Sequence, residues 1–412
     1  MKIRLVSINF SPELTGVGKY NGDMVRWMDE HGIDVDVITA VPYYPEWRVH
    51  DGYKGIAFRR ELLGRVVVNR CPIYVPKNPS VIRRMLHLIS FSVSSFLRLF
   101  SIRSQRPDVL VVVEPTLFCT PLVLLYCKVF NIKSILHIQD FEIDAMFGLG
   151  MAGGSGGIFE RFAYSIESWL MKQFDKVSSI SYSMLEKANQ KGVAEEKLLF
   201  FPNWSDISFV HPEVDGKAMR RKWGVGDDEK VVLYAGNVGA KQGLELVVEA
   251  AERFKTRTNV KFFLVGSGAY VSNLVRLSRD RSLTNVEFKP LQAWEDVPAM
   301  LSMADVHLIV QRKGAADAVL PSKLTNILSS GGYGVVTAEA HTELGRLADE
   351  YPGIYTCVEP ESLDAFCEGL EVELDRAQGV NTVARDYAEK NLNKDAILQQ
   401  FSCDLVKLCN NV

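Results

Sequence analysis

The chain has 412 residues, of which 47% are apolar and 24% are charged, and its formal net charge is −3. This length is too great for one hydrophobic core, so two domains of about 200 residues each are expected. The composition is that of an ordinary globular protein and excludes disordered, collagen-like and coiled-coil classes. The seven cysteines are scattered without a C-x-x-C pair, which indicates reduced thiols and neither a disulfide framework nor a zinc site.

Short β-branched runs alternate with helical patterns along the whole chain. In the first half, strands are expected near residues 3–8, 35–39, 66–69, 109–113, 134–138 and 177–180. The pattern restarts after residue 225, with strands near residues 231–235, 260–265, 286–288, 306–310 and 334–337. Continuously apolar strands that alternate with helices predict parallel sheets covered by helices on both faces. The expected fold class is therefore α/β, with two Rossmann-like doubly wound domains facing a cleft.

The domain boundary is expected within residues 201–212, where the periodicity stops and prolines cluster. This gives an N-terminal Rossmann-like domain over 1–205 and a C-terminal Rossmann-like domain over 206–385. Residues 386–412 are predicted to form a helix that packs back toward the first domain. The N-terminus lacks the pattern of a signal peptide, and no apolar run is long enough for a transmembrane helix, so we expect a cytoplasmic protein.

Residues 48–106 contain 12 basic and only 2 acidic side chains. Such an excess of positive charge indicates an anionic partner: acidic lipid head groups, a lipid diphosphate or nucleic acid. Within this region, apolar residues at helical spacing are flanked by Arg83, Arg84 and Arg98. This pattern favours a helix that lies on an anionic membrane surface. The alternative is an ordinary packed helix whose arginines face solvent.

A glycine-containing turn follows the first strand and includes Gly16 and Gly18. Two glycines allow a ligand to approach the backbone, and the following helix presents its positive end. A nicotinamide site is disfavoured, because residue 21 is asparagine where that motif needs glycine, and no carboxylate follows the second strand. The alternative interpretation is an ordinary strand–helix turn.

The second domain offers three further candidates for binding a diphosphate. Residues 236–243 contain Gly236, Asn237 and Lys241 between a strand and a helix, and a second turn begins at Gly266. No Gly-Lys-Ser/Thr sequence closes the first turn, so it is not a Walker loop. The third candidate is the segment that contains Asp317 and Lys323. A lysine in the first turn of a helix is unfavourable unless an anion lies there, which makes Lys323 a predicted anion contact.

A polar cluster ends the strand near residues 134–138. His137 lies at the carboxyl end of this strand with carboxylates close by, including Asp140. A single histidine is often a hydrogen-bonded structural group, but this position favours a functional role. We therefore take His137 and Asp140 as candidate catalytic residues.

Taken in order, these segments resemble the family 4 glycosyltransferases of the GT-B fold, and in particular the colanic-acid-type exopolysaccharide glycosyltransferases, a branch with proposed fucosyltransferases. The resemblance covers nearly the whole chain. It rests on the stretches 9–20 (NFSPELTGVGKY), 42–45 (PYYP), 70–76 (RCPIYVP), 115–118 (PTLF), 136–140 (LHIQD), 201–204 (FPNW) and 320–324 (LPSKL).

The resemblance implies that the C-terminal domain holds a nucleotide sugar and that the N-terminal domain holds the acceptor. By position, Gly16 and Gly18 would contact the donor phosphates, and His137 would lie beside the donor sugar. The basic pair that the family places on the diphosphate is replaced by Asn237 and Gln242. The paired glutamates of the family fall on Ala318 and Asn326. We therefore expect Lys241, Asp317 and Lys323 to supply part of the donor contacts.

The predicted activity is the transfer of a sugar, with fucose or a related deoxy sugar as the candidate, from a GDP- or UDP-linked donor to a lipid-diphosphate-linked saccharide in exopolysaccharide biosynthesis. The resemblance implies a retaining hexosyltransferase-type enzyme that needs no metal and no cofactor and works at the anionic inner face of the membrane, with no nucleic acid as partner. Two alternatives remain: a non-hydrolysing sugar-nucleotide epimerase, and a non-enzymatic scaffold that binds membranes or nucleic acid.

Overall fold

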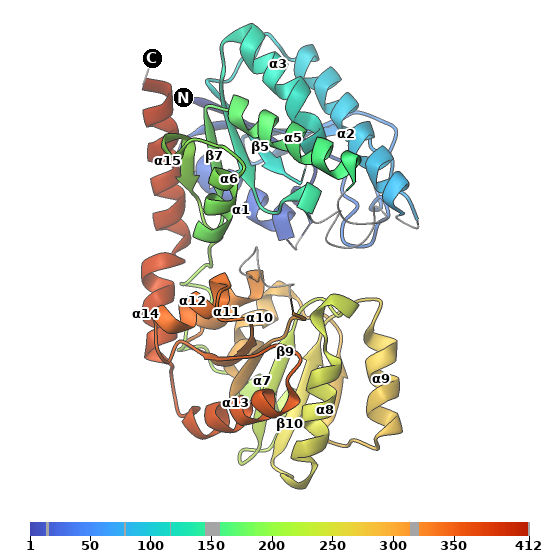
Figure 1. Cartoon of the computed structure of the whole chain (residues 1–412), viewed down its shortest axis with the longest axis vertical. Coiled ribbons are helices and arrows are strands. Elements are labelled where there is room, and N and C mark those ends of the chain that lie inside the picture. Colours follow the sequence, from blue (N-terminus) through green and yellow to red (C-terminus); the bar gives the residue numbers. More distant parts are fainter. Residues whose placement is uncertain (14–15, 78–79, 116, 145–156, 314–320, 411–412) are drawn as a thin grey trace. The chain divides into compact units, whose positions relative to one another are not determined.

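The computed structural model describes all residues except 14–15, 78–79, 116, 145–156, 314–320 and 411–412 (Figure 1). It divides into two units, one of Met1–Pro202 together with Leu398–Val412 and one of Asn203–Ile397. The joint after Pro202 lies inside the segment where the sequence predicts it. The C-terminal return to the first unit begins at Leu398, later than the predicted residue 386.

The first unit is organised by an eight-stranded sheet with the order β3-β4-β2-β1-β5-β6-β7-β8. All neighbouring strands are parallel except β3, which pairs antiparallel with β4. The strands are β1 (Lys2–Ser7), β2 (Asp34–Ala40), β3 (Arg59–Leu63), β4 (Val66–Cys71), β5 (Val109–Glu114), β6 (Lys133–Ile138), β7 (Lys176–Ser179) and β8 (Leu198–Phe200). The central strand β5 is buried at every position, as expected for a strand covered on both faces.

The helices of the first unit are α1 (Gly16–Glu30), α2 (Val81–Ser101), α3 (Thr120–Phe130), α5 (Ile158–Gln173) and α6 (Tyr182–Gln190). The connection from β1 to β2 runs in one direction along the sheet, and the connections that contain α2, α3 and α5 run in the other. Because parallel crossovers are right-handed, α1 covers one face of the sheet and α2, α3 and α5 cover the opposite face. These three helices form one layer, in which α2 contacts α3 and α3 contacts α5 (Figure 1).

The second unit contains a six-stranded parallel sheet with the order β11-β10-β9-β12-β13-β14. Its strands are β9 (Lys230–Ala235), β10 (Val260–Val265), β11 (Val286–Lys289), β12 (Val306–Ile309), β13 (Tyr333–Thr337) and β14 (Thr356–Val358). Its helices are α7 (Lys217–Lys222), α8 (Glu245–Arg253), α9 (Val271–Asp280), α10 (Val297–Ser302), α11 (Ser322–Ser329), α12 (Glu343–Glu350), α13 (Leu363–Arg376) and α14 (Thr382–Asn391). The two sheets confirm the predicted α/β class with two doubly wound parallel-sheet units.

The last helix, α15 (Lys394–Asn410), begins in the second unit and ends in the first. Within the first unit, Phe401 of this helix stacks on Phe201, with the ring centroids 3.8 Å apart. Among the residues described, no helix has both the length and the apolarity that are needed to cross a membrane.

Candidate functional site

The strand order of the first unit reverses direction between β1 and β5, and ligands of parallel α/β sheets bind at the carboxyl ends of strands beside such a reversal. Glu13, in the loop after β1, is buried there. Its Oε1 accepts hydrogen bonds of 3.0 Å from the backbone N–H groups of Tyr43 and Tyr44. Burial raises the pKa of Glu13, while these hydrogen bonds act in the opposite direction. The carboxylate thus joins the loops that follow β1 and β2.

Both glycines predicted at this turn belong to α1. Gly16 has a φ of +58°, in the left-handed region that favours glycine. A Cβ on Gly18 would lie 2.9 Å from the Cβ of Glu13, so the glycine makes room for this buried side chain. Contact of Gly16 and Gly18 with donor phosphates stays a prediction.

His137 lies in β6 with 3% of its surface exposed. Its Nε2 is 2.9 Å from Nε2 of Gln139, an amide nitrogen that can only donate, so the histidine Nε2 accepts. Its Nδ1 therefore carries the proton and donates to Oγ of Ser178 at 2.9 Å. Burial lowers the pKa of His137 to about 3, which keeps the ring neutral. Both ring nitrogens of His137 therefore have hydrogen-bond partners within the protein, as in a structural histidine. The role of His137 beside a donor sugar stays a prediction, as does the role of Asp140, which is exposed just after β6.

A buried carboxyl cluster that the sequence does not predict lies at the ends of β5 and β6. Oε1 of Glu114 accepts a 3.1 Å hydrogen bond from the backbone N–H of Glu142, whose own Oε2 accepts one of 3.0 Å from Leu117. Glu167 from α5 is also fully buried and forms an ion pair with Lys191. Burial raises the pKa of Glu114 well above its usual value and raises that of Glu142 to about 7. The sequence signals are the carboxylates that follow the strand of His137, which include Glu142, and a glutamate that ends the otherwise apolar strand β5.

In the second unit, the strand order reverses between β9 and β12, and the predicted glycine turns lie at this edge. A Cβ on Gly266 would lie 1.8 Å from the carbonyl oxygen of Gly236, and a Cβ on Gly268 would lie 2.1 Å from that of Val238. The backbone N–H of Val238 donates to Ser267 at 2.9 Å. Gly266 and Gly268 therefore allow the two turns to pack backbone against backbone.

Lys323, in the first turn of α11, lies directly beside the first of these turns. Its Nζ is 3.9 Å from the centroid of the Tyr234 ring, and a Cβ on Gly236 would lie 3.7 Å from its Cδ. Tyr234 is buried, and its hydroxyl donates to the backbone oxygen of Asn237 at 2.7 Å. Among the described residues, no carboxylate or carbonyl oxygen contacts the Lys323 ammonium group. Burial lowers the pKa of Lys323 to about 7, so the group is poised to gain a proton when an anion arrives.

The other predicted donor contacts have different outcomes. Asn237 is exposed at the tip of the turn. Oε1 of Gln242, which stands where the family places a lysine, accepts a 3.0 Å hydrogen bond from the N–H of Gly239 and so closes the turn. Lys241 lies in a short 3-10 helix, η3 (Ala240–Gln242), but its side chain is outside the part of the chain that the structure describes. Asp317 also lies outside the described residues.

Arg312, which sequence reasoning missed, adds a second cation at this edge. It follows β12, and its Nε donates to the carbonyl oxygen of Ala240 at 2.9 Å, while its terminal nitrogens pair with Glu245 and Glu361. It lines an open cavity of about 270 Å³ together with Gly243, Glu245, Leu246, Glu249, Val310, Gln311 and Glu361. The carboxyl edge of β12 is therefore hollowed next to the glycine turn.

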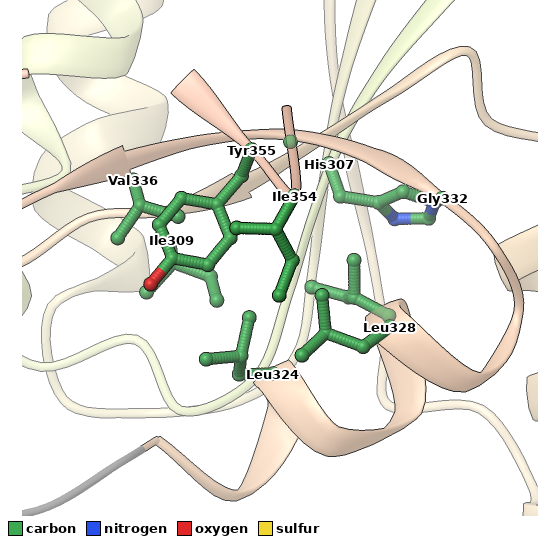
Figure 2. Close-up of a pocket in the computed structure, with 10 residues that line it drawn as sticks. His307, Ile309, Leu324, Leu328, Gly332, Val336, Ile354 and Tyr355 are labelled. Carbon is green, nitrogen blue, oxygen red and sulfur yellow. The ribbon is translucent and has the colours of Figure 1, made fainter. Parts of the chain in front are cut away.

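A second space, beneath α11, is not suited to a nucleotide. It is enclosed mainly by aliphatic and aromatic side chains and is too small for a water molecule (Figure 2). His307 borders it with an Nε2 that has no hydrogen-bond partner, and burial lowers the pKa of His307 to about 4. Figure 2 shows the His307 ring next to Gly332, where a Cβ would lie 2.5 Å from its Cδ2. This region is part of the core.

The three arginines predicted to face a membrane are placed differently from one another. Arg83 is exposed on α2, and the guanidinium of Arg84 lies 5.5 Å from the ring centroid of Trp47. Arg98 donates to Oδ1 of Asn69 in β4 through Nε at 2.9 Å and Nη2 at 2.6 Å. The prediction for Arg98 is therefore corrected, because the guanidinium is turned toward the sheet by a buried amide acceptor.

Two doubly wound parallel-sheet units, the second with glycine turns and a lysine at its strand-order reversal, have the architecture of the GT-B fold. Two family models match the chain: "Glycosyl transferase 4-like domain" over residues 15–204 and "Glycosyl transferases group 1" over residues 215–375. A protein of Escherichia coli (strain K12), WcaI, whose name assigns it to colanic acid biosynthesis as a glycosyl transferase, is 50% identical over 98% of this chain and 100% of its own length.

Solved structures show the same fold at low sequence identity. Sucrose-phosphate synthase from Thermosynechococcus elongatus has a TM-score of 0.77 at 16% identity and full coverage of both chains. HepE from Anabaena, in complex with UDP-glucose, has a TM-score of 0.68 at 14% identity, over 98% of this chain and 99% of its own. The chain belongs to the family 4 glycosyltransferases and is similar over its whole length to the colanic acid glycosyl transferase WcaI, which confirms the family expected from the sequence.

Proposed function

We propose that this chain transfers a sugar from a nucleotide donor to a lipid-linked saccharide during the synthesis of a colanic-acid-like exopolysaccharide. The name of the WcaI relative supports the pathway, and the complex of HepE with UDP-glucose supports a nucleotide sugar as donor. The basic character of residues 48–106 supports an acceptor at the anionic cytoplasmic surface of the inner membrane. Fucose or a related deoxy sugar is the candidate for the transferred group.

The observation that carries this proposal is the position of Lys323. Its ammonium group lies over the Tyr234 ring, beside Gly236, where the strand order reverses. A cation with this placement can exchange its contact with the ring for a contact with a phosphate oxygen. Arg312 lies on the other side of the same turn, where its guanidinium is already paired with Glu245 and Glu361, so Lys323 is the cation that the proposal uses. The donor diphosphate would therefore lie over the turn at residues 236–243.

The chemistry follows from the charge that develops when the sugar–phosphate bond breaks. The diphosphate gains negative charge, and a preorganised cation or N–H donor at this position is worth about 3–4 kcal/mol in the transition state. The acceptor hydroxyl would form the new bond on the face from which the diphosphate departs, which retains the configuration, and its proton would pass to the leaving phosphate oxygen. This route needs no metal or cofactor and leaves His137 as a neutral group that helps to position its surroundings.

The test combines binding with product analysis. Thermal-shift screening against UDP-, GDP- and dTDP-sugars should identify one stabilising donor, and Lys323→Met should weaken its binding about tenfold or more without unfolding the chain. Lys313→Met, which removes an exposed lysine paired with Glu359, is the matched control. Incubation of the donor with a lipid extract should move the sugar into the lipid fraction. An isomerised nucleotide sugar formed without any acceptor would instead identify an epimerase.

A further inference from the structure

The outer face of α2 is apolar although it is exposed. The aliphatic side chains at 41–71% exposure recur at helical spacing along its whole length: Ile82, Leu86, Ile89, Val93 and Leu97. Apart from them, the only exposed described positions of α2 are Arg83 and Ser101.

The inner face of α2 is mixed, because it buries polar side chains together with Phe91 and Leu99. Ser92 and Ser94 are buried, and their hydroxyls donate to the backbone oxygens of Phe118 and Pro72, each at 2.7 Å. His87 is buried as well and contacts the backbone oxygen of Tyr74 through Nδ1 at 2.6 Å. A helix that faces water would place such polar groups outside and its leucines inside. The apolar face of α2 is therefore built for a non-aqueous contact.

The two helices of the same layer continue this surface. α3 exposes Leu125 and Val129, and α5 exposes Phe162, Ile166 and Trp169, each at least 41% exposed. Both sets recur at a spacing of three or four residues, so each forms a stripe on one side of its helix. Because α3 contacts both α2 and α5 on one face of the sheet, the three stripes look outward on the same side.

The charge around these stripes is mostly of one sign, with the partly exposed Glu160 in the first turn of α5 as the acidic exception. The exposed charged residues of the three helices, among the positions that the structure describes, are basic: Arg83, Lys128, Arg161 and Lys172. α2 and α3 contain no aspartate or glutamate, and Glu167 of α5 is buried against Lys191. Apolar side chains rimmed by cations match the boundary between the acyl chains and the head groups of an anionic bilayer.

We propose that α2, α3 and α5 form one membrane-docking face, which seats the first unit on an anionic lipid surface with Trp169 and Phe162 as aromatic anchors. Exposed apolar patches of this extent are uncommon on soluble monomers unless they bind a partner. This proposal rests on the proposed function in one respect, namely that the lipid-linked acceptor lies at the membrane surface. It extends that function from the basic residues of one helix to an apolar surface shared by three.

Vesicle co-sedimentation tests this surface without any substrate. The probes are vesicles of phosphatidylglycerol with phosphatidylcholine and vesicles of phosphatidylcholine alone. Val129→Glu and Trp169→Glu should each weaken binding to the anionic vesicles about tenfold or more. Each replaces an apolar side chain that the docked protein would bury in the acyl region of the bilayer. Val372→Glu, at a valine on α13 of the second unit that is 49% exposed against 60% for Val129, should bind as the wild type does. Brominated lipids should quench the fluorescence of the wild type more than that of Trp169→Phe.

The proposal is overturned if both glutamate variants bind the vesicles as the wild type does. It is also overturned if ultracentrifugation without lipid shows a wild-type dimer that these variants dissociate, because the face would then join two copies of the chain. Stabilisation by the donor nucleotide sugar is measured in parallel. Lost vesicle binding with intact donor binding supports the docking face, whereas absent donor binding in the wild type argues against the transferase and leaves the vesicle result valid.

Discussion

Raising the pH from about 7 to about 8.5 should weaken the binding of UDP-glucose, or of whichever nucleotide sugar the screen identifies, and replacing Lys323 by arginine should remove this dependence. Burial lowers the pKa of Lys323 to about 7, so the free protein loses the charge of this side chain over that range. A bound diphosphate stabilises the charged form and raises the pKa. Arginine remains charged throughout and can stack on Tyr234 in the same way.

The size of the effect follows from the two protonation equilibria. If the pKa of Lys323 in the complex lies well above 8.5, the dissociation constant rises about 16-fold between pH 7 and pH 8.5, which corresponds to about 1.6 kcal/mol. At pH 8 the free side chain carries about 0.1 proton, so each binding event takes up about 0.9 proton. The sign is fixed: affinity falls as the pH rises, because the folded protein without ligand holds a neutral lysine.

Isothermal titration calorimetry in buffers with different ionisation enthalpies measures both quantities. The observed heat should vary with the buffer for the wild type and for Lys313→Met, and should be nearly independent of it for Lys323→Arg. A wild-type affinity that stays constant over this pH range, with no proton uptake, would show that the diphosphate does not contact Lys323. The glycine turn would then need another ligand.

Three further changes test single residues, one within the first unit and two within the second. His137→Gln should make the fold less sensitive to acid. Because the buried histidine stays neutral in the folded state, the free energy of unfolding falls as the pH drops below the unfolded pKa of about 6.5, by about 1.4 kcal/mol at pH 5.5. Denaturant titration of the wild type and the variant at two pH values measures this difference. Gly266→Ala should cost roughly 3 kcal/mol or more in thermal unfolding, because its Cβ would meet the Gly236 oxygen, whereas Gly226→Ala, which meets only ordinary contacts, should cost little. Asn237→Arg should strengthen donor binding about tenfold by restoring a charge that the family commonly has, and unchanged affinity would place the phosphates elsewhere.

Hydrophobic patterning predicts the strands that are both long and apolar, and misses those that are short or exposed. All the strands expected in the two halves are present within a few residues of their predicted bounds. The missed strands are β3, whose sequence RRELL is largely exposed, and β8 and β14, which have three residues each. These edge segments are held by backbone pairing with a neighbouring strand, which leaves little trace in the sequence of the segment itself.

Glycine turns are predictable in position but not in purpose. Gly18 and Gly266 were both expected near phosphates, yet the closest atoms to their missing Cβ positions belong to Glu13 and to Gly236. The sequence shows that bulk is excluded at such a residue, and only the packed structure shows whether protein or ligand excludes it. Lys323 is a candidate because its position runs against the helix dipole, whereas the ring of Tyr234 beside it is about ninety residues away in the chain and carries no local signal.

The helix α2 shows why periodicity alone cannot assign the two sides of a helix. The spacing of its apolar residues predicts a helix, and the usual expectation would bury the apolar side of that helix against the sheet. The structure buries Ser92 and Ser94 together with Phe91 and Leu99, and the two serine hydroxyls donate to the backbone oxygens of Phe118 and Pro72. A buried carbonyl without a donor costs about 1–3 kcal/mol, so these two bonds favour the observed orientation of the helix. Five aliphatic side chains are left outside, namely Ile82, Leu86, Ile89, Val93 and Leu97, and the proposed lipid surface is an environment that would cover them.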